Sequence, residues 1–158
     1  MKVLITGGAG YLGTVLTEEI LNRFPYAKVI VYDNLMYKQD GLFSFFKYPK
    51  DRFEFVYGDV RDKNSLLEQL QKLDKNNDYV IPLAAIVGFP ACARDEKLAT
   101  AVNFEHVKYI VQSTKCRIIY PNTNSGYGVS DGEAHCTEET PLAPISVYGR
   151  TKCDAEEW

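Results

Sequence analysis

The chain has 158 residues, of which 46% are hydrophobic and 25% are charged, which is enough for one soluble domain with a buried core. Its 18 basic and 21 acidic side chains leave a formal net charge of −3, and no basic run or stripe suits a nucleic-acid backbone. Every apolar stretch is far shorter than the roughly 20 residues that cross a bilayer, so we expect no membrane span. Because Met1 and Lys2 lead directly into a short apolar run with no cleavage site, we expect no secretory signal and a cytoplasmic location.

Apolar runs alternate with amphipathic stretches along the whole chain. Residues 2–6 form a β-branched run that stops at glycines, and residues 11–23 then place Leu12, Leu16 and Ile20 on one face of a helix. The later segments continue the alternation, with apolar runs at 28–32, 53–57, 79–83 and 117–120, helical patterns at 63–73, 95–113 and 144–158, and a Tyr- and Phe-rich loop with a short helix at 34–50. Runs that are apolar throughout suit strands of a parallel sheet covered on both faces, so the pattern predicts a doubly wound parallel α/β sheet.

The thiol and imidazole groups stand apart in the sequence. None of them has the spacing of a metal site: Cys92, Cys116, Cys136, Cys153, His106 and His135. We therefore expect reduced thiols and no bound metal.

A glycine-rich turn follows the first predicted strand and opens the first predicted helix. The segment TGGAGYLG at residues 6–13 reads as G-x-x-G-x-x-G through Gly7, Gly10 and Gly13. In such a turn one glycine makes the tight bend, another lets the backbone approach a pyrophosphate, and the last lets helix and strand pack closely. The pyrophosphate then lies at the N-terminus of the helix, where amide groups favour an anion. We therefore expect this turn to bind a dinucleotide.

Asp33 ends the second predicted strand, twenty residues beyond Gly13. An acidic side chain at this place accepts hydrogen bonds from the ribose hydroxyls of adenosine and repels a 2′-phosphate. The sequence therefore predicts NAD rather than NADP. The alternative is that Asp33 only forms the turn after the strand, where aspartate is common.

Tyr148 and Lys152 lie four residues apart in the last predicted helix, so both face the same side. A phenol with an unperturbed pKa near 10 is a poor base at neutral pH, and a neighbouring ammonium would lower that pKa. The spacing is common by chance, and the alternative is a surface pair with no role. The helix with Tyr148 and Lys152 follows the fifth strand of a dinucleotide-binding fold, and this position favours Tyr148 as the base of a hydride-transfer reaction.

Together these segments resemble the extended short-chain dehydrogenase/reductase family, and within it the NAD-dependent nucleotide-sugar epimerases and dehydratases. Six motifs carry the resemblance, in family order and over nearly the whole chain: TGGAGYLG (6–13), YDNL (32–35), GDVRD (58–62), PLAAIVG (82–88), TNSGYG (123–128) and YGRTK (148–152). The resemblance implies a Rossmann-type NAD-binding domain over residues 1–158.

The resemblance also implies which residues hold the cofactor. The pyrophosphate turn is Gly7, Gly10, Tyr11 and Leu12, and the adenosine ribose is contacted by Asp33 and Asn34. The adenine ring is contacted by Asp59 and Val60. At the end of the fourth strand, the cofactor is lined by Leu83, Ala84 and Ala85. Lys152 is implied to hold the nicotinamide ribose beside Tyr148.

By the same resemblance, Tyr148 is the catalytic base, Lys152 is its partner, and Thr123 is the hydroxyl that binds the reacting sugar oxygen. The implied substrate is a nucleotide-diphosphate sugar, with further contacts from Asn103, Asn124 and Ser125. Tyr148 would take a proton from the sugar hydroxyl, usually at C4, while a hydride leaves the same carbon for NAD. In an epimerase the 4-keto sugar then turns over and takes the hydride back on its other face.

Departures from the family pattern narrow this prediction. The family's 4,6-dehydratases carry an Asp-Glu pair directly after the Ser/Thr, whereas Asn124 and Ser125 follow Thr123 here. That difference favours an epimerase, with a keto-sugar reductase as an alternative. Pro82 and Ile86 also replace a histidine and a lysine that are common in the family, which leaves the sugar open.

Family members are roughly twice as long and carry a C-terminal substrate domain after the Tyr/Lys helix. The resemblance therefore implies that the chain lacks this domain and is the N-terminal part of a longer enzyme. A naturally short, non-catalytic NAD-binding module is the alternative. Leu98, Val102 and Val107 could pack in the core or form half of the helix-bundle homodimer interface that the family often uses.

Overall fold

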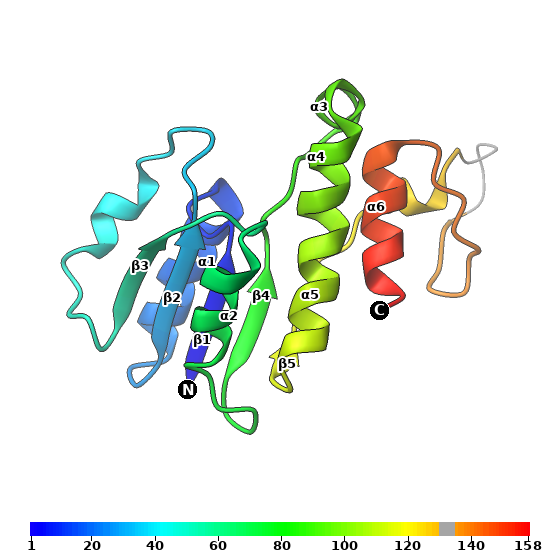
Figure 1. Cartoon of the computed structure of the whole chain (residues 1–158). Coiled ribbons are helices and arrows are strands. Elements are labelled where there is room, and N and C mark those ends of the chain that lie inside the picture. The colour runs from blue at the N-terminus through cyan, green and yellow to red at the C-terminus, as the bar shows by residue number, and fades with distance from the viewer. Residues whose placement is uncertain (130–134) are drawn as a thin grey trace. The chain divides into compact units, whose positions relative to one another are not determined.

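The computed structural model describes residues 1–129 and 135–158, which divide into two compact units (Figure 1). The first, called the sheet unit below, comprises Met1–Ala84 and Tyr109–Tyr120. The second, called the helical unit, comprises Ala85–Lys108 and the described part of Pro121–Trp158. The glycine-rich turn and Asp33 therefore belong to the sheet unit, and Thr123, Tyr148 and Lys152 belong to the helical unit.

The sheet unit is built on five parallel strands. They are β1 (Lys2–Thr6), β2 (Lys28–Asp33), β3 (Phe53–Tyr57), β4 (Tyr79–Pro82) and β5 (Arg117–Ile118). Their order in the sheet is β3-β2-β1-β4-β5, and β1 pairs in parallel with both β2 and β4. The strand order therefore reverses beside β1, as in a Rossmann-type doubly wound sheet, and the predicted fold class is confirmed.

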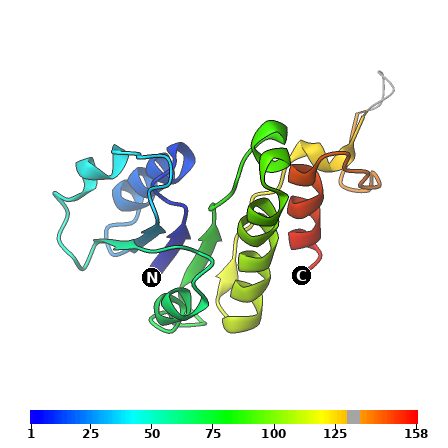
Figure 2. The same ribbon diagram turned by 45° about the horizontal axis from the view of Figure 1, so that its top comes forward.

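Helices cover both faces of this sheet, which explains why its central strands β1, β2 and β4 are mostly apolar and buried. The helices α1 (Tyr11–Arg23) and α2 (Lys63–Leu70) lie on opposite faces, as Figures 1 and 2 show. Between β1, β2 and α1, side chains such as Ile5 and Val29 are completely buried. The short helix η1 (Gly41–Phe45), which the loop at 34–50 was expected to contain, adds its buried residues to the same core.

The helical unit consists of short helices and turns. They are α3 (Phe89–Arg94), α4 (Glu96–Thr100), η2 (Ala101–Glu105), the start of α5 (His106–Ser113), η3 (Asn124–Tyr127) and α6 (Val147–Glu156). The segments α4, η2 and α5 follow one another directly and form the helix predicted at 95–113, except that η2 is a π-helical turn. The helix α6 packs against α3, α4, η2 and η3.

Polar caps set the ends of the helices that carry site residues. The hydroxyl of Ser146 accepts a hydrogen bond from the Gly149 amide at 3.0 Å, so α6 begins at Val147 and not at the predicted 144. Asp95 accepts a hydrogen bond from the Leu98 amide at 2.9 Å and separates α4 from α3.

No helix within residues 1–129 and 135–158 is long and apolar enough to cross a membrane.

Candidate functional site

The turn between β1 and α1 brings three stretches of backbone into close contact within the sheet unit. Gly7 has a φ of +70°, and its amide donates to the Tyr32 carbonyl at 2.9 Å. A Cβ atom on Gly7 would lie 2.4 Å from the Ala84 nitrogen, so only glycine fits here. The N-cap of α1 is Gly10, which offers no side chain to the first turn of the helix. The amides of that turn are therefore available to an anion, as the sequence predicts.

Asp33 lies at the carboxyl end of β2, 7% exposed, and holds this turn in place. Its Oδ2 accepts a hydrogen bond from the Ala9 amide at 3.0 Å, and its Oδ1 accepts one from the Leu35 amide at 2.7 Å. Each carboxylate oxygen has a second lone pair that can accept a further donor. The carboxylate thus stabilises the turn, as the alternative interpretation expected, and keeps acceptor capacity for a ribose hydroxyl.

Asn34 and Asp59, both predicted beside adenosine, contact each other directly. The Asn34 amide donates to Asp59 Oδ2 at 3.1 Å. Arg61, whose role the GDVRD motif alone does not reveal, donates to both carboxylate oxygens at 2.9 and 2.6 Å. These Arg61 bonds are the main reason that the pKa of Asp59 falls to about 2. The next residue, Val60, is buried.

The end of β4 supplies the backbone beneath the glycine-rich turn. The Leu83 amide donates to the Thr6 carbonyl at 2.9 Å, and this bond extends the pairing of β1 and β4 by one residue. Ala84 follows as the residue that contacts Gly7. The cofactor contacts that the resemblance implies for Leu83 and Ala84 stay predictions, and the next residue, Ala85, begins the helical unit.

Thr123 and Tyr148 meet in the helical unit. Thr123 is the N-cap of η3, and its hydroxyl accepts a bond from the Ser125 amide at 3.2 Å. The same hydroxyl hydrogen-bonds to the Tyr148 phenol, which lowers the pKa of that phenol, but burial outweighs this effect. The pKa of Tyr148 is therefore raised above its usual value, with a smaller contribution of the same sign from the Cys92 thiol. The expected lowering of this pKa is not found, because desolvation of the phenolate dominates.

Lys152 follows Tyr148 by one turn of α6 and is 5% exposed. Burial lowers the pKa of its ammonium group to about 8. Lys152 is therefore charged at neutral pH and loses its charge in a range where most lysines keep theirs. Such a buried lysine beside a phenol is unusual for a surface pair, which was the alternative interpretation.

Asn103 occupies the middle of the π-helical turn η2 and is 1% exposed. Its Oδ1 accepts the Ile86 amide at 2.8 Å, and its Nδ2 donates to the Ile86 carbonyl at 3.1 Å and to Thr151 Oγ1 at 3.2 Å. Thr151 stands between Tyr148 and Lys152 on α6. The side chain thus connects the segment after β4 with α6, and its burial gives no support to the predicted contact with a sugar.

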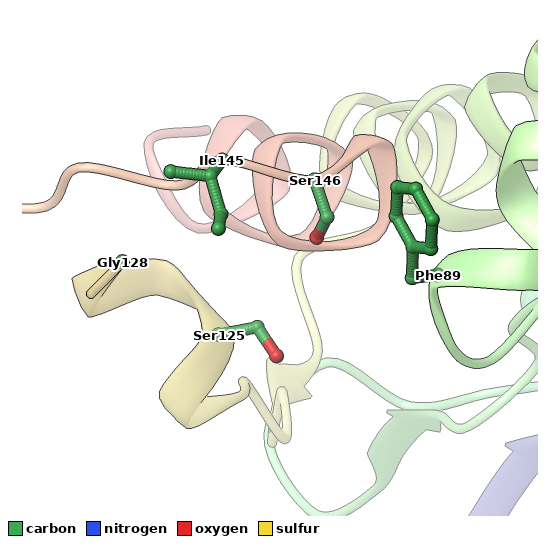
Figure 3. A pocket seen from close by; sticks show the side chains of 5 residues that line it. All are labelled: Phe89, Ser125, Gly128, Ile145 and Ser146. Atoms are coloured by element: carbon green, nitrogen blue, oxygen red, sulfur yellow. The ribbon is translucent and has the colours of Figure 1, made fainter.

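A pocket of about 260 Å³ opens within the helical unit (Figure 3). It is lined by Phe89, Ser125, Gly128, Ile145 and Ser146. Of these only Ser125 was predicted as a substrate contact; Gly128 ends the quoted motif TNSGYG, and Phe89, Ile145 and Ser146 lie outside the quoted motifs. Ser125 and the Thr123 hydroxyl lie 3.3 Å apart, so hydrogen bonds connect the pocket wall with Tyr148. None of the five lining residues is charged. Asn124, the remaining predicted contact, opens η3 between Thr123 and Ser125.

Across residues 1–129 and 135–158, no group of three or more His, Cys, Asp or Glu side chains is gathered as metal ligands would be. The parallel sheet, the glycine-rich turn with Asp33, and the helix with Tyr148 and Lys152 define a dinucleotide-binding α/β protein of the short-chain dehydrogenase type. The chain belongs to the NAD dependent epimerase/dehydratase family, whose model matches residues 3–158. Family membership and NAD as the family's cofactor are thereby confirmed.

Three relatives illustrate the range of the family. The chain is 31% identical over 178 residues to a CDP-paratose 2-epimerase of Salmonella typhi, and this alignment covers 100% of this chain and 52% of that protein. Among solved structures, the dTDP-glucose 4,6-dehydratase DesIV of Streptomyces venezuelae with NAD bound matches 99% of this chain and 50% of its own, with a TM-score of 0.87 and 27% identity. The UDP-glucuronic acid 4-epimerase of Bacillus cereus in complex with NAD has a TM-score of 0.84 and 27% identity, and the match covers 99% of this chain and 50% of that one. The chain spans about half the length of the curated relatives it matches.

Proposed function

We propose that the protein containing this chain is an NAD-dependent nucleotide-sugar epimerase that oxidises a sugar hydroxyl, at C4, to a transient keto group and then returns the hydride. The observation that carries the proposal is the hydrogen-bonded pair of Thr123 and Tyr148, with the buried Lys152 one turn further along α6. A phenol and a threonine hydroxyl that share one hydrogen bond can both contact a single substrate oxygen. A non-catalytic module has no need of such a pair.

The residues of the sheet unit fit NAD. The tight bend at Gly7, where only glycine fits, and the uncapped amides at the start of α1 suit a pyrophosphate between Gly7, Gly10, Tyr11 and Leu12. Asp33 and Asn34 would contact the adenosine ribose, with Asp33 accepting hydrogen bonds from its hydroxyls, and Asp59 and Val60 would line the adenine. When bound, NAD accepts and returns the hydride.

The chain's own residues would handle the proton. Tyr148 is a neutral phenol at pH 7, because burial raises its pKa. The positive charge of Lys152 would favour the phenolate, which forms when the phenol gives up its own proton to solvent and which then takes the proton of the sugar hydroxyl. Thr123 would donate a hydrogen bond to the same sugar oxygen while negative charge develops on it. Both events reverse when the keto group is reduced, so the proton returns to the sugar.

An epimerase fits these residues better than a dehydratase. Elimination of water across C5 and C6 needs an acid and a base beside the sugar, and neither Asn124 nor Ser125 supplies one. The uncharged lining of the pocket beside them agrees with this choice. The nucleotide-sugar substrate is proposed because the names of the relatives specify CDP-, dTDP- and UDP-linked sugars.

We place the protein in the cytoplasm and propose that it forms a homodimer through a helix bundle. Val102 and Val107 are buried within the chain, so they serve its own core and would not form the interface. Phe104 in η2 and Trp158, which follows α6, both lie beneath the Lys108 ammonium group and remain as partly exposed apolar groups. The oligomeric state of the full-length protein, measured by light scattering, tests this proposal.

The central test uses the full-length protein with its bound cofactor and a panel of UDP-, GDP-, CDP- and dTDP-sugars. We expect epimerisation of at least one sugar, and a loss of about 10²- to 10⁴-fold in kcat for Tyr148→Phe, the range typical of a removed acid-base group. Tyr26→Phe is the matched control, because Tyr26 is 95% exposed. Turnover that Tyr148→Phe leaves unchanged would sink the assignment of the base.

A further inference from the structure

The π-helical turn η2 changes the hydrogen bonding of one helical turn. In an α-helix the amide of residue 106 would bond to the carbonyl of residue 102, four positions back. Here the His106 amide donates to the Ala101 carbonyl, five positions back. The His106 amide, which an α-helix would direct to the Val102 carbonyl, therefore bonds elsewhere. The π-helical turn contains one residue more than an α-helical turn, and Asn103 lies within it.

The imidazole of His106 contacts the carbonyl that this change affects. His106 is 2% exposed, and its Nδ1 hydrogen-bonds to the Val102 carbonyl oxygen. Because a carbonyl oxygen can only accept, the proton of this bond resides on Nδ1. Burial lowers the pKa of His106 to about 4, and the nearby Lys152 charge acts in the same direction, so the ring is neutral at pH 7. Its Nε2 is then an acceptor.

We propose that His106 is a positioning residue of the reaction site: its Nδ1–H gives Val102 the hydrogen bond that the π-helical turn withdraws, and so holds Asn103 in place. The proposal rests on the proposed function for the roles of Tyr148 and Lys152. The contacts that it explains lie entirely within the helical unit and do not depend on the substrate.

The effect passes from His106 to α6 through Asn103. If η2 returned to regular α-helical bonding, the side chains of the turn would rotate by about 100°, the angle of one residue. Asn103 would then lose Ile86 and Thr151, to which its amide bonds at 2.8 to 3.2 Å. Thr151 is the residue before Lys152, so the helix that carries the phenol and the ammonium would lose its buried connection to the segment after β4.

Three substitutions of His106 distinguish the effect of the position of its N–H donor from the effect of its side-chain volume. His106→Asn keeps an N–H donor close to the place of Nδ1, His106→Gln moves the donor to the place of Nε2, and His106→Leu removes it. In the full-length protein, we expect His106→Asn to retain kcat within about threefold. His106→Gln and His106→Leu should lose about 10- to 100-fold in kcat with little change in KM, as expected when catalytic groups are misplaced by about 1 Å.

A second measurement does not need a substrate. The ionisation of Tyr148 can be followed by ultraviolet absorbance, as the difference between each protein and the same protein carrying Tyr148→Phe. Burial is the largest cause of the raised pKa of Tyr148, so loosening of the site should admit water and lower it. We expect this shift in His106→Gln and His106→Leu and not in His106→Asn. Failure of the epimerase proposal would remove the kinetic result but not this one.

The tautomer of His106 can be read directly in the unmodified protein from its imidazole nitrogen resonances. His135, the other histidine and an exposed one, is identified with His135→Gln. A proton on Nδ1 at pH 7 supports the proposal, and a proton on Nε2 overturns it. Equal behaviour of His106→Asn and His106→Gln in the tyrosine titration also overturns it. Melting temperatures serve as the control, because a role in stability alone would lower them without separating the two variants in the titration.

Discussion

Replacement of Asp33 by Asn should weaken both the fold of the sheet unit and its selection of cofactor. The carboxylate accepts the Ala9 and Leu35 amides at 3.0 and 2.7 Å, and Ala9 is 2% exposed. An asparagine has one acceptor oxygen, so it can keep one bond and must turn an N–H₂ group toward the other amide. A hydrogen bond to a charged group contributes about 1.5–3 kcal/mol, so Asp33→Asn should cost about 2 kcal/mol. Urea unfolding followed by circular dichroism measures this loss.

The same substitution should change the ratio of NAD to NADP affinity. Without the negative charge of Asp33, the repulsion of a 2′-phosphate falls, and the preference for NAD should drop by about tenfold. Calorimetric titration with each cofactor gives the ratio. Asp51→Asn is the matched control, because Asp51 lies in an exposed turn. If Asp33→Asn unfolds at the same urea concentration as the parent protein, the bonds to Ala9 and Leu35 do not hold the turn, and an unchanged cofactor ratio would refute the assigned contact with the ribose.

Two further predictions concern pH. The Arg61 bonds depress the pKa of Asp59 to about 2 from its usual 3.8, so they add stability above pH 4 that disappears as the pH falls toward 2. Arg61→Ala should therefore lower the free energy of unfolding by about 1 kcal/mol at pH 7, because the Arg61 side chain is 48% exposed and its charge is screened by solvent. The free energies of unfolding of the two proteins should converge as the pH falls toward 2. A difference that stays constant with pH would contradict this prediction. Lys152, with a pKa of about 8, should give the turnover rate a falling limb near pH 8. The Lys152→Arg variant keeps its positive charge at this pH, so a folded variant with the parent kcat at pH 7 should lack the falling limb. If the limb persists in this variant, a group other than Lys152 causes it.

The sheet could be predicted from the sequence because its central strands β1, β2 and β4 are mostly apolar and turn residues follow them directly. Each of the five strands overlaps its predicted range, and the buried central strands show no polar alternation that would confuse the assignment. The predicted helix at 95–113 contains the π-helical turn, which its periodicity did not reveal. Such a turn depends on contacts across the unit, those of Asn103 with Ile86 and Thr151, and these residues are far apart in sequence.

The electrostatics of the site were the least predictable part. The spacing of Tyr148 and Lys152 predicts that they share a face, but it does not report how much water each group loses on folding. Burial decided both pKa values and moved the phenol opposite to expectation. Arg61 was missed for a related reason: its motif was read for Asp59, whose partner could be identified only once both side chains were placed.

The meeting of Thr123 and Tyr148 depends on how closely η3 lies on α6, and two glycines permit that distance. A Cβ atom on Gly149 would lie 2.7 Å from the Ser125 carbonyl oxygen, and one on Gly126 would lie 2.8 Å from the Cys153 sulfur. Any larger side chain at residue 149 would push against backbone, which has no freedom to rotate away, so Thr123 and Ser125 would move off the helix. The contact at Gly126 is with the end of a side chain and is easier to relieve. Gly149 is therefore the stricter requirement, which gives a physical reason for a glycine directly after Tyr148 in this chain.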